Sequence, residues 1–349
     1  MKIYSVFKHL AFKLDPEFIH DVTINSAHML PFASKLFNSR VTEQKYQLKK
    51  GALNWSFPVG LAAGFDKNAL AINFFENLGF GAVEIGTITK EAQLGNPKPR
   101  IFRHPNIKSI QNAMGFPNQG STKILENLKK SSHQKICIGA NIGKNKKTSE
   151  AMTPEEYAYL YSMFAPYSDY LIVNISSPNT PGLRNFQKKE LLLPILKELK
   201  TAQEKNSKPI FIKIAPDLEV ENLKMICELA KELSFSGIVA TNTTIQHEFG
   251  TGGLSGEYIK PYAKMIRMKT CEFLKEDPSQ TIIGVGGIDC YQDIKDFWKQ
   301  GGSFTQVYTG LIYHGPELLQ QIKQALDLDM KKNNFSTVQE LHKNIKEID

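Results

Sequence analysis

The sequence predicts an α/β protein, a (β/α)8 TIM barrel with a small N-terminal helical extension. From residue 57 onward, eight short apolar runs alternate with helix-like stretches. Near-continuous apolar strands separated by helices indicate a parallel sheet. The chain of 349 residues is long for two small domains, and it suits one barrel with an extension.

The expected strands follow one another in a regular order. They are 58-PVGLAAG, 80-FGAVEIG, 136-ICIGANIG, 170-YLIVNIS, 209-PIFIKIA, 236-SGIVATN, 281-TIIGVGG and 304-FTQVYTG. The insertion 95-GNPKPRIFRHPNIKSIQNAMGFPN, between the second and third strands, is too long for a simple loop and is expected to be functional. A doubly wound open sheet fits the same alternation and is the alternative fold. No G-x-G-x-x-G opens a helix after the first strand, so a Rossmann-type NAD site is not expected.

Residues 1–40 are predicted to form the helical extension, and residues 41–349 the barrel. Apolar residues recur at helical spacing over 3–14. Asp15-Pro16-Glu17 is typical of a helix start, with Asp15 as the N-cap and Pro16 in the first turn. A third short helix is expected over 32–37, and a last amphipathic helix over about 328–349.

The composition is that of a soluble globular protein with a net charge of +8. No nucleic-acid motif accompanies the lysines, so the basic excess favours an anionic small molecule or an anionic membrane surface. The cysteines form no C-x-x-C pair, which excludes an obvious zinc site or disulfide framework and favours a reducing cytosol. No apolar run approaches the roughly 20 residues of a membrane-spanning helix, and the N-terminus is not expected to be a signal peptide. The N-terminal helices either pack on the barrel or lie on a membrane surface.

Polar side chains recur where the expected strands end, at the edge that carries the active site in barrels. They comprise two lysines, several carboxamides and several hydroxyls, without a carboxylate pair or a cluster of metal ligands. Such groups suit a flat, anionic heterocycle held by hydrogen bonds, and the glycines after strands seven and eight suit a phosphate. The residues predict a phosphate-bearing cofactor with a small planar substrate. A non-redox barrel that binds a phosphorylated metabolite, with Lys213 as a Schiff-base lysine, is the rival.

Nine segments of the chain form a recognisable set: GLAAGFDKN, PRIFRH, NAMGF, NISSPNTPGL, KIAPD, ATNTT, GGLSG, GVGGI and QVYTG. In order and spacing they resemble the dihydroorotate dehydrogenase family, in its membrane-associated, quinone-dependent class. The resemblance implies oxidation of (S)-dihydroorotate to orotate with one FMN per subunit. It further implies electron transfer to a membrane quinone (ubiquinone or menaquinone), the fourth step of de novo pyrimidine (UMP) biosynthesis. A soluble member using fumarate or NAD is the nearer alternative.

The resemblance places the chemistry in NISSPNTPGL. Ser177 is expected to remove a proton from C5 of the substrate while hydride leaves C6 for flavin N5. The soluble class has a cysteine at this position. Because a free serine is a poor base, the proton needs a relay, for which the family pattern implies Thr180, with Phe116 shielding the site from water.

The resemblance also implies the binding residues. The expected substrate contacts are Lys67, Asn112, Ala113, Met114, Gly115, Phe116, Asn174, Asn179, Asn242 and Thr243. The expected FMN contacts are Ala63, Gly64, Phe65, Asp66, Lys67, Thr87, Asn141, Asn174, Lys213, Thr241, Gly256, Gly287, Tyr308 and Thr309. His20, Arg103 and Tyr308 are expected to line the quinone site, and no metal is expected. The chain is expected to be a monomer, bound peripherally by its extension to the lipid bilayer at the cytoplasmic face of the cell membrane, with no nucleic-acid partner.

Overall fold

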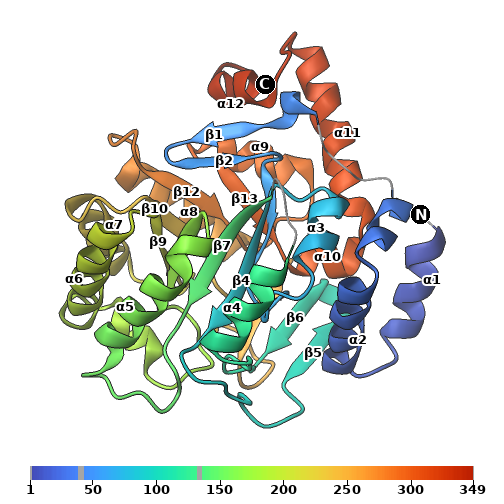
Figure 1. The fold of residues 1–349 in the computed structure, drawn as a ribbon. Coiled ribbons are helices and arrows are strands. Elements are labelled where there is room, and N and C mark those ends of the chain that lie inside the picture. Colours follow the sequence, from blue (N-terminus) through green and yellow to red (C-terminus); the bar gives the residue numbers. More distant parts are fainter. Residues whose placement is uncertain (1, 38–42, 132–135, 349) are drawn as a thin grey trace.

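A closed barrel of eight parallel strands forms the centre of the computed structural model, which describes residues 2–37, 43–131 and 136–348 (Figure 1). In order around the barrel, the strands are β3 (Val59–Leu61), β4 (Ala82–Ile88), β7 (Cys137–Ile142), β8 (Tyr170–Asn174), β9 (Ile210–Ile214), β10 (Gly237–Ala240), β12 (Thr281–Gly284) and β13 (Phe304–Val307). All eight predicted runs therefore form strands. The pairing of β13 with β3 closes the ring and excludes the open sheet.

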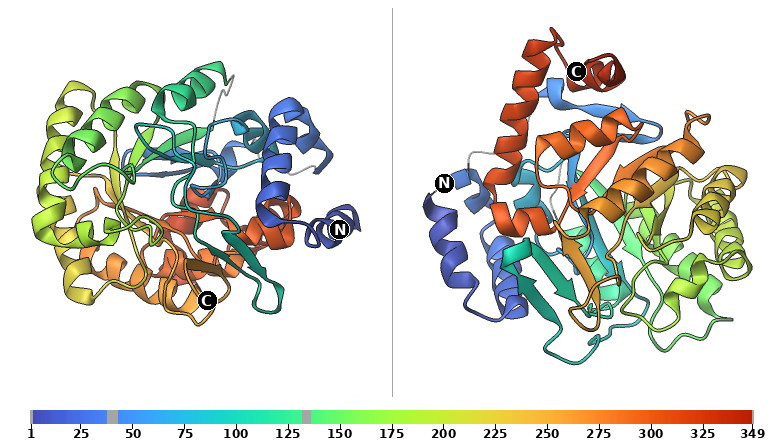
Figure 2. Two further views of the ribbon diagram at one scale, coloured as in Figure 1. Left: turned by 90° about the horizontal axis from the view of Figure 1, so that it is seen from below. Right: turned by 180° about the vertical axis from the view of Figure 1, so that it is seen from behind.

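Helices surround the barrel, as Figure 2 shows from below and from behind. They are α3 (Ile72–Leu78), α4 (Ser121–Lys130), α5 (Thr153–Phe164), α6 (Lys189–Lys205), α7 (Val220–Glu232), α8 (Lys260–Leu274), α9 (Tyr291–Lys299), α10 (Thr309–His314) and α11 (Glu317–Lys332). Short 3-10 turns are η4 (Ala165–Tyr167) and η5 (Leu183–Gln187). The helices cover the outer face of the strands, so every residue of β4 and β9 is buried, and the strands are continuous apolar runs in the sequence.

The N-terminal segment forms two α-helices and a 3-10 helix, α1 (Lys2–Ala11), α2 (Pro16–Met29) and η1 (Pro31–Phe37). The predicted start of α2 is confirmed, because the Asp15 side chain accepts a hydrogen bond from the Phe18 backbone N–H at 2.8 Å. The third predicted helix, over 32–37, is present as the 3-10 helix η1, which is wound more tightly than an α-helix. The predicted boundary between residues 40 and 41 lies outside the described residues.

Two small sheets flank the barrel. The hairpin of β1 (Leu48–Lys50) and β2 (Leu53–Trp55), preceded by η2 (Gln44–Tyr46), brings Trp55 against the ring of Phe304, 4.5 Å between centroids. The long insertion forms β5 (Ile101–His104), η3 (Pro105–Ile107) and β6 (Ser109–Asn112), which pair with β11 (Gly253–Gly256) in an antiparallel sheet. This sheet lies beside α2 (Figure 1).

The C-terminal segment corrects one prediction. Instead of a single amphipathic helix over about 328–349, α11 ends at Lys332 and a turn leads to α12 (Val338–Lys343) and η6 (Ile345–Glu347). Thr337 starts α12 with a capping box, in which its side chain and that of Glu340 satisfy each other's backbone N–H groups. The apolar spacing correctly predicted the buried face, since Val338 and Leu341 are buried, but the cap interrupts the helix. In the described part of the chain, no helix is both long and apolar enough to cross a bilayer.

Replacing Trp55 by alanine should destabilise the barrel by about 3–5 kcal/mol, because a large side chain with no exposed surface would leave a cavity. Urea denaturation of the purified protein measures this free energy. Leu328→Ala on α11 is the control, since that side chain is 70% exposed and its loss should change stability by less than about 0.5 kcal/mol. Equal effects of the two substitutions would contradict the proposed packing role of Trp55.

Candidate active site

A pocket opens at the carboxyl ends of the barrel strands, covered on one side by the β5–β6–β11 sheet. Most residues predicted for the site line it together. They are Ala63, Gly64, Lys67, Thr87, Asn112, Met114, Gly115, Phe116, Asn174, Ser177, Asn179, Lys213, Thr241, Asn242, Thr243, Gly256, Gly287, Tyr308 and Thr309.

The other predicted residues lie just behind this lining. Phe65 and Asp66 line an adjoining groove that shares Lys67 with the pocket. Ala113 contributes its backbone, whose carbonyl accepts a hydrogen bond from Asn96 at 3.0 Å. Asn141 is fully buried behind Thr87. Thr180 is buried within the loop that carries Ser177.

Glu84 is the centre of the polar network at the floor of the pocket. It is fully buried on β4, and its carboxylate accepts hydrogen bonds from Lys213 at 3.0 Å and Asn141 at 2.7 Å through Oε1. Gln306 donates to the other oxygen at 2.6 Å. A buried carboxylate is tolerated only when paired and hydrogen-bonded, and these three donors meet that need. Because Lys213 pairs with Glu84, its ammonium is held in place and electrostatically compensated.

The carboxamides and hydroxyls extend this network toward the pocket. Thr87 donates to Asn141 Oδ1 at 2.6 Å, and Asn174 Nδ2 donates to Thr87 Oγ1 at 2.9 Å and to Asn141 Oδ1 at 3.1 Å. On the facing side, Asn242 Nδ2 donates to Ser176 Oγ at 3.1 Å. Each amide is therefore held in a fixed orientation before any ligand binds, which lowers the entropic cost of binding.

The loop after β8 presents Ser177 to the pocket. The Asn179 backbone N–H donates to Ser177 Oγ at 3.3 Å, and the Asn179 side chain donates to Asn112 Oδ1 at 2.9 Å. Arg184 supports the loop from behind, donating to Ser176 O at 3.1 Å and pairing with Asp217 at 2.6 Å. Ser177 is therefore both nearly buried and fixed in position.

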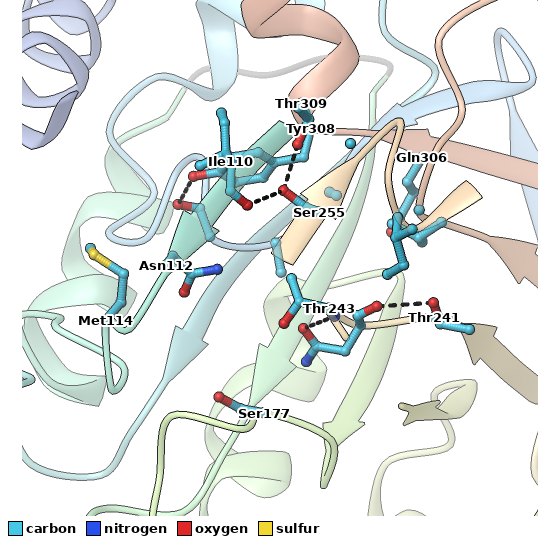
Figure 3. Close-up of a pocket in the computed structure, with 18 of the residues that line it drawn as sticks. Ile110, Asn112, Met114, Ser177, Thr241, Thr243, Ser255, Gln306, Tyr308 and Thr309 are labelled. Atoms are coloured by element: carbon cyan, nitrogen blue, oxygen red, sulfur yellow. Dashed lines mark hydrogen bonds between the residues drawn. The ribbon is translucent and has the colours of Figure 1, made fainter. Parts of the chain in front are cut away.

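Two buried hydroxyls of residues predicted for the site have no hydrogen-bond partner among the described residues. They are Thr180 Oγ1 and Thr243 Oγ1. Buried polar atoms without partners are rare in native proteins and need a bound water or ligand to satisfy them. Thr243 also lines the pocket (Figure 3), so its hydroxyl is available to a polar ligand there.

The other end of the pocket suits a phosphate. Figure 3 shows Ser255 and Thr309 at this end, away from Ser177; their hydroxyl oxygens are 2.8 Å apart. Gly256 and Gly287 have φ of +87° and +70°. A Cβ at Gly256 would lie 2.4 Å from Lys108 O, and one at Gly287 2.7 Å from Lys260 Cα. Only glycine fits at these positions, and the exposed backbone can approach an anion closely.

Lys67 also lines the pocket, and its environment differs from that of Lys213. Its Nζ lies 2.9 Å from His20 Nε2. Burial of the ammonium lowers the pKa of Lys67 to about 8, against the opposing influence of Asp21, Glu17 and Asp66. A desolvated ammonium with a neutral neighbour is well suited to bind a carboxylate.

The three residues predicted for the quinone site lie along the junction with the N-terminal helices, in two groups. His20 and Tyr308 both pack edge-on against Phe65, with centroid distances of 5.4 Å and 5.2 Å. Arg103 contacts other residues. Its Cζ lies 4.7 Å from the centroid of the Phe12 ring, and its Nη1 donates to Leu14 O at 2.9 Å. Burial raises the pKa of Tyr308 to about 12, so its phenol stays protonated.

The sequence prediction missed several residues that line the pocket or support its lining from behind. Glu84 was missed although it is the one acidic residue in the apolar run 80-FGAVEIG, a signal that could have found it. Gln306 lies in the segment QVYTG, and Ser255 in GGLSG, but neither was singled out. Lys108 and Arg184 carried no sequence signal, because their contacts depend on how distant loops meet.

A barrel with a phosphate cradle, fixed carboxamides and a buried serine defines a class of enzymes that bind a phosphate-bearing cofactor beside a small polar substrate. Comparison with known proteins gives the family. The profile of the family described as "Dihydroorotate dehydrogenase" matches residues 47–330. The chain belongs to the dihydroorotate dehydrogenase family, whose members are flavin-dependent oxidoreductases in general.

Individual relatives agree with this assignment over most of their length. The chain is 41% identical to the dihydroorotate dehydrogenase (quinone) of Christiangramia forsetii, covering 92% of this chain and 98% of the relative. It is 39% identical to the protein of the same name from Sulfurimonas denitrificans, covering 96% and 97%. The crystal structure of DHODH from Eimeria tenella in complex with ferulenol superposes with a TM-score of 0.85 at 31% identity, covering 93% of this chain and 94% of that one. The predicted family and fold are confirmed.

Glu84→Gln should destabilise the protein by about 3–5 kcal/mol, because it leaves the Lys213 ammonium buried without its counter-charge. The double variant Glu84→Gln, Lys213→Met removes both charges and should lose less stability than the sum of the single losses. Chemical denaturation of the four proteins measures this coupling. Additive losses would show that the two side chains do not stabilise each other.

Proposed function

We propose that this protein oxidises (S)-dihydroorotate to orotate and passes the electrons to a membrane quinone (ubiquinone or menaquinone), the fourth step of de novo pyrimidine (UMP) biosynthesis. The observation that carries the proposal is Ser177, buried at one end of the pocket among carboxamides that are already oriented. Relatives named dihydroorotate dehydrogenase (quinone) support the choice of substrate and acceptor.

FMN is the cofactor that the pocket fits, and one is proposed per subunit. Gly256, Gly287, Ser255 and Thr309 offer a cradle for its phosphate. Lys213 is held by Glu84 at the floor of the pocket, where its nitrogen would donate a hydrogen bond to the flavin and stabilise negative charge there. When bound, FMN supplies N5 as the acceptor of the hydride that leaves C6 of dihydroorotate. The remaining proposed contacts are Ala63, Gly64, Phe65, Asp66, Lys67, Thr87, Asn141, Asn174, Thr241 and Tyr308.

The pairing of Lys213 also bears on the rival barrel with a Schiff-base lysine. A lysine that forms a Schiff base must present a neutral amine to its substrate. Lys213 instead donates to the buried Glu84 carboxylate at 3.0 Å, so its nitrogen is already engaged in a buried ion pair. This observation supports an electrostatic role for Lys213.

Dihydroorotate would be held by the groups around Ser177. Lys67 would bind the substrate carboxylate, and the amides of Asn112, Asn174, Asn179 and Asn242 would pair with the ring N–H and C=O groups. The unpartnered Thr243 hydroxyl would complete these hydrogen bonds. The backbone of 113–115 lies along the same wall.

Ser177 would take the proton from C5, and the proton must then leave through a relay because a serine is a weak base. Thr180, three residues on, has a buried hydroxyl without a partner among the described residues and could carry the proton or a bridging water. Phe116 lines the pocket with its backbone at φ +53° and would exclude bulk water from this end.

Residues 1–40 would form the membrane-associated extension of a monomer, and residues 41–349 the catalytic barrel. Large apolar side chains are exposed along α1, α2, η1 and their connections: Val6, Phe7, Leu10, Leu14, Phe18, Val22, Met29, Leu30 and Phe32. Such a surface suits peripheral binding to a lipid bilayer, here the cytoplasmic face of the cell membrane. A quinone would reach the flavin between these helices and the barrel, past Arg103, Tyr308 and His20.

Ser177→Ala should slow flavin reduction by dihydroorotate about 10²–10⁴-fold, the usual contribution of a positioned base. Anaerobic mixing with dihydroorotate, followed as bleaching of the flavin absorbance, measures the rate. Ser176→Ala is the matched control, since the Ser176 hydroxyl is bonded to Asn174 and Asn242 and should affect the rate far less. A larger loss of rate in Ser176→Ala than in Ser177→Ala would identify Ser176 as the base. A wild-type flavin that dihydroorotate does not bleach would contradict the proposed reaction.

The pKa of Lys67, lowered to about 8 by burial, predicts a pH dependence of substrate binding. Below that pH the ammonium can bind the substrate carboxylate, and above it Lys67 loses its proton. We therefore expect kcat/KM for dihydroorotate to fall about tenfold per pH unit above that point. The pH profile of Lys67→Arg, which stays protonated, should lack this fall even if its activity is lower at all pH values. An identical fall in Lys67→Arg would assign it to another group.

A further inference from the structure

Helix α2 of the N-terminal extension forms a buried ion pair with the barrel insertion. Glu17 Oε1 lies 2.6 Å from Arg100 Nη2, and Glu17 Oε2 accepts from Arg100 Nε at 3.1 Å. The two side chains are only 7% and 6% exposed. Arg100 Nη1 also donates to the carbonyls of Leu94 and Asn96, both at 2.6 Å. The guanidinium therefore fixes the 94–96 turn relative to α2.

Asn96 continues this chain of contacts to the loop that carries Ser177. Its side-chain nitrogen donates to Ala113 O and to Asn179 O, both at 3.0 Å. Asn179 in turn bonds Asn112 and Ser177 Oγ. An unbroken series of hydrogen bonds thus runs from Glu17 in the extension to the substrate end of the pocket.

A second contact leaves α2 one turn later, from the same face of the helix. His20 Nε2 lies 2.9 Å from Lys67 Nζ. Because an ammonium can only donate, His20 must accept with its neutral ring. The pKa of His20 lies well below its usual value, through burial and the charge on Lys67, in agreement with a neutral ring. His20 and Glu17 line one groove together with Lys67, Asn96 and Arg100.

Attachment of α2 to the barrel alone does not require these groups. His28, on the same helix, already attaches it by a hydrogen bond with Leu70 O at 2.8 Å, at an exposed position. A buried pair such as Glu17–Arg100 has a desolvation cost that an exposed contact avoids. Unlike the His28 contact, the Glu17–Arg100 pair connects through Asn96 to Asn179, and His20 contacts Lys67 directly.

We propose that Glu17 and His20 are positioning residues for the dihydroorotate side of the pocket, so that the extension controls substrate binding as well as the approach of the quinone. The inference rests on the proposed function. It assigns to α2 an effect on flavin reduction, the half-reaction in which the quinone takes no part.

The test compares both half-reactions in the full-length flavoprotein. Glu17→Gln breaks the ion pair, and Asn96→Ala removes the link on the barrel side. For each, anaerobic bleaching by dihydroorotate gives the reductive half-reaction, and re-oxidation of photoreduced flavin by a short-chain quinone gives the oxidative one. His28→Ala and the exposed Glu126→Gln are the matched controls.

We expect both Glu17→Gln and Asn96→Ala to lower the apparent second-order rate of bleaching about tenfold or more, since small displacements of binding groups are costly. Re-oxidation should be unchanged. The double variant should bleach no more slowly than the more impaired of the two single variants, because both changes interrupt one series of contacts. His20→Leu should weaken orotate binding, measured by the shift of the flavin spectrum, and His20→Gln, which keeps an acceptor, should restore part of it.

The opposite results overturn the inference. These are normal bleaching in Glu17→Gln, a loss confined to re-oxidation, additive losses in the double variant, or an equal loss in His28→Ala. If Glu17→Gln does not fold, Asn96→Ala decides, because its substitution leaves the buried ion pair intact. Bleaching of wild type with a normal Glu17→Gln rejects the inference alone, whereas no bleaching of wild type rejects the proposed function and the inference with it.

Discussion

The pocket depends on one buried carboxylate. Glu84 is fully enclosed by the barrel and accepts hydrogen bonds from Lys213, Asn141 and Gln306, which lie on three other strands. A charge in that position is unfavourable unless each of its lone pairs is used. The requirement fixes the rotamers of its donors, and Asn141 passes the constraint to Thr87 and Asn174. The floor of the pocket is therefore rigid because its centre is ionic.

Much of the fold followed from local sequence signals. Parallel strands buried on both faces must be apolar throughout, so the strands from β3 to β13 that form the barrel stood out as runs. The cap at Asp15 likewise depends only on neighbouring residues. By contrast, the capping box at Thr337 was overlooked, because apolar spacing continued across it and suggested one uninterrupted helix. Closure of the barrel has no local signal of its own, since it depends on β13 meeting β3 across almost the whole length of the chain.

The candidate site was predictable where its residues follow strands directly, and less so where loops meet. Ser177 and Thr243 stand at strand ends, and the family resemblance pointed to both. Glu84 lies within the apolar run that forms β4, and a single acidic residue in such a run does not by itself indicate a functional site. Arg184 and Asn96 act through backbone carbonyls of residues far away in the chain. Such contacts leave no periodicity or spacing in the sequence, so only the folded structure reveals them.

Lys213 and Lys67 line the same pocket but have different neighbours, so the two parts of the pocket differ in charge. Lys213 is paired with an ionised carboxylate, so the pair adds little net charge and serves mainly to orient a dipole beneath the ligand. Lys67 has the neutral ring of His20 as its hydrogen-bond neighbour, and the carboxylates of Asp21, Glu17 and Asp66 act on it without a direct ion pair among the described residues. In the proposed reaction, the carboxylate of the substrate would bind on the Lys67 side of the pocket rather than at the floor. Since His20 belongs to α2, that asymmetry depends on a residue outside the barrel.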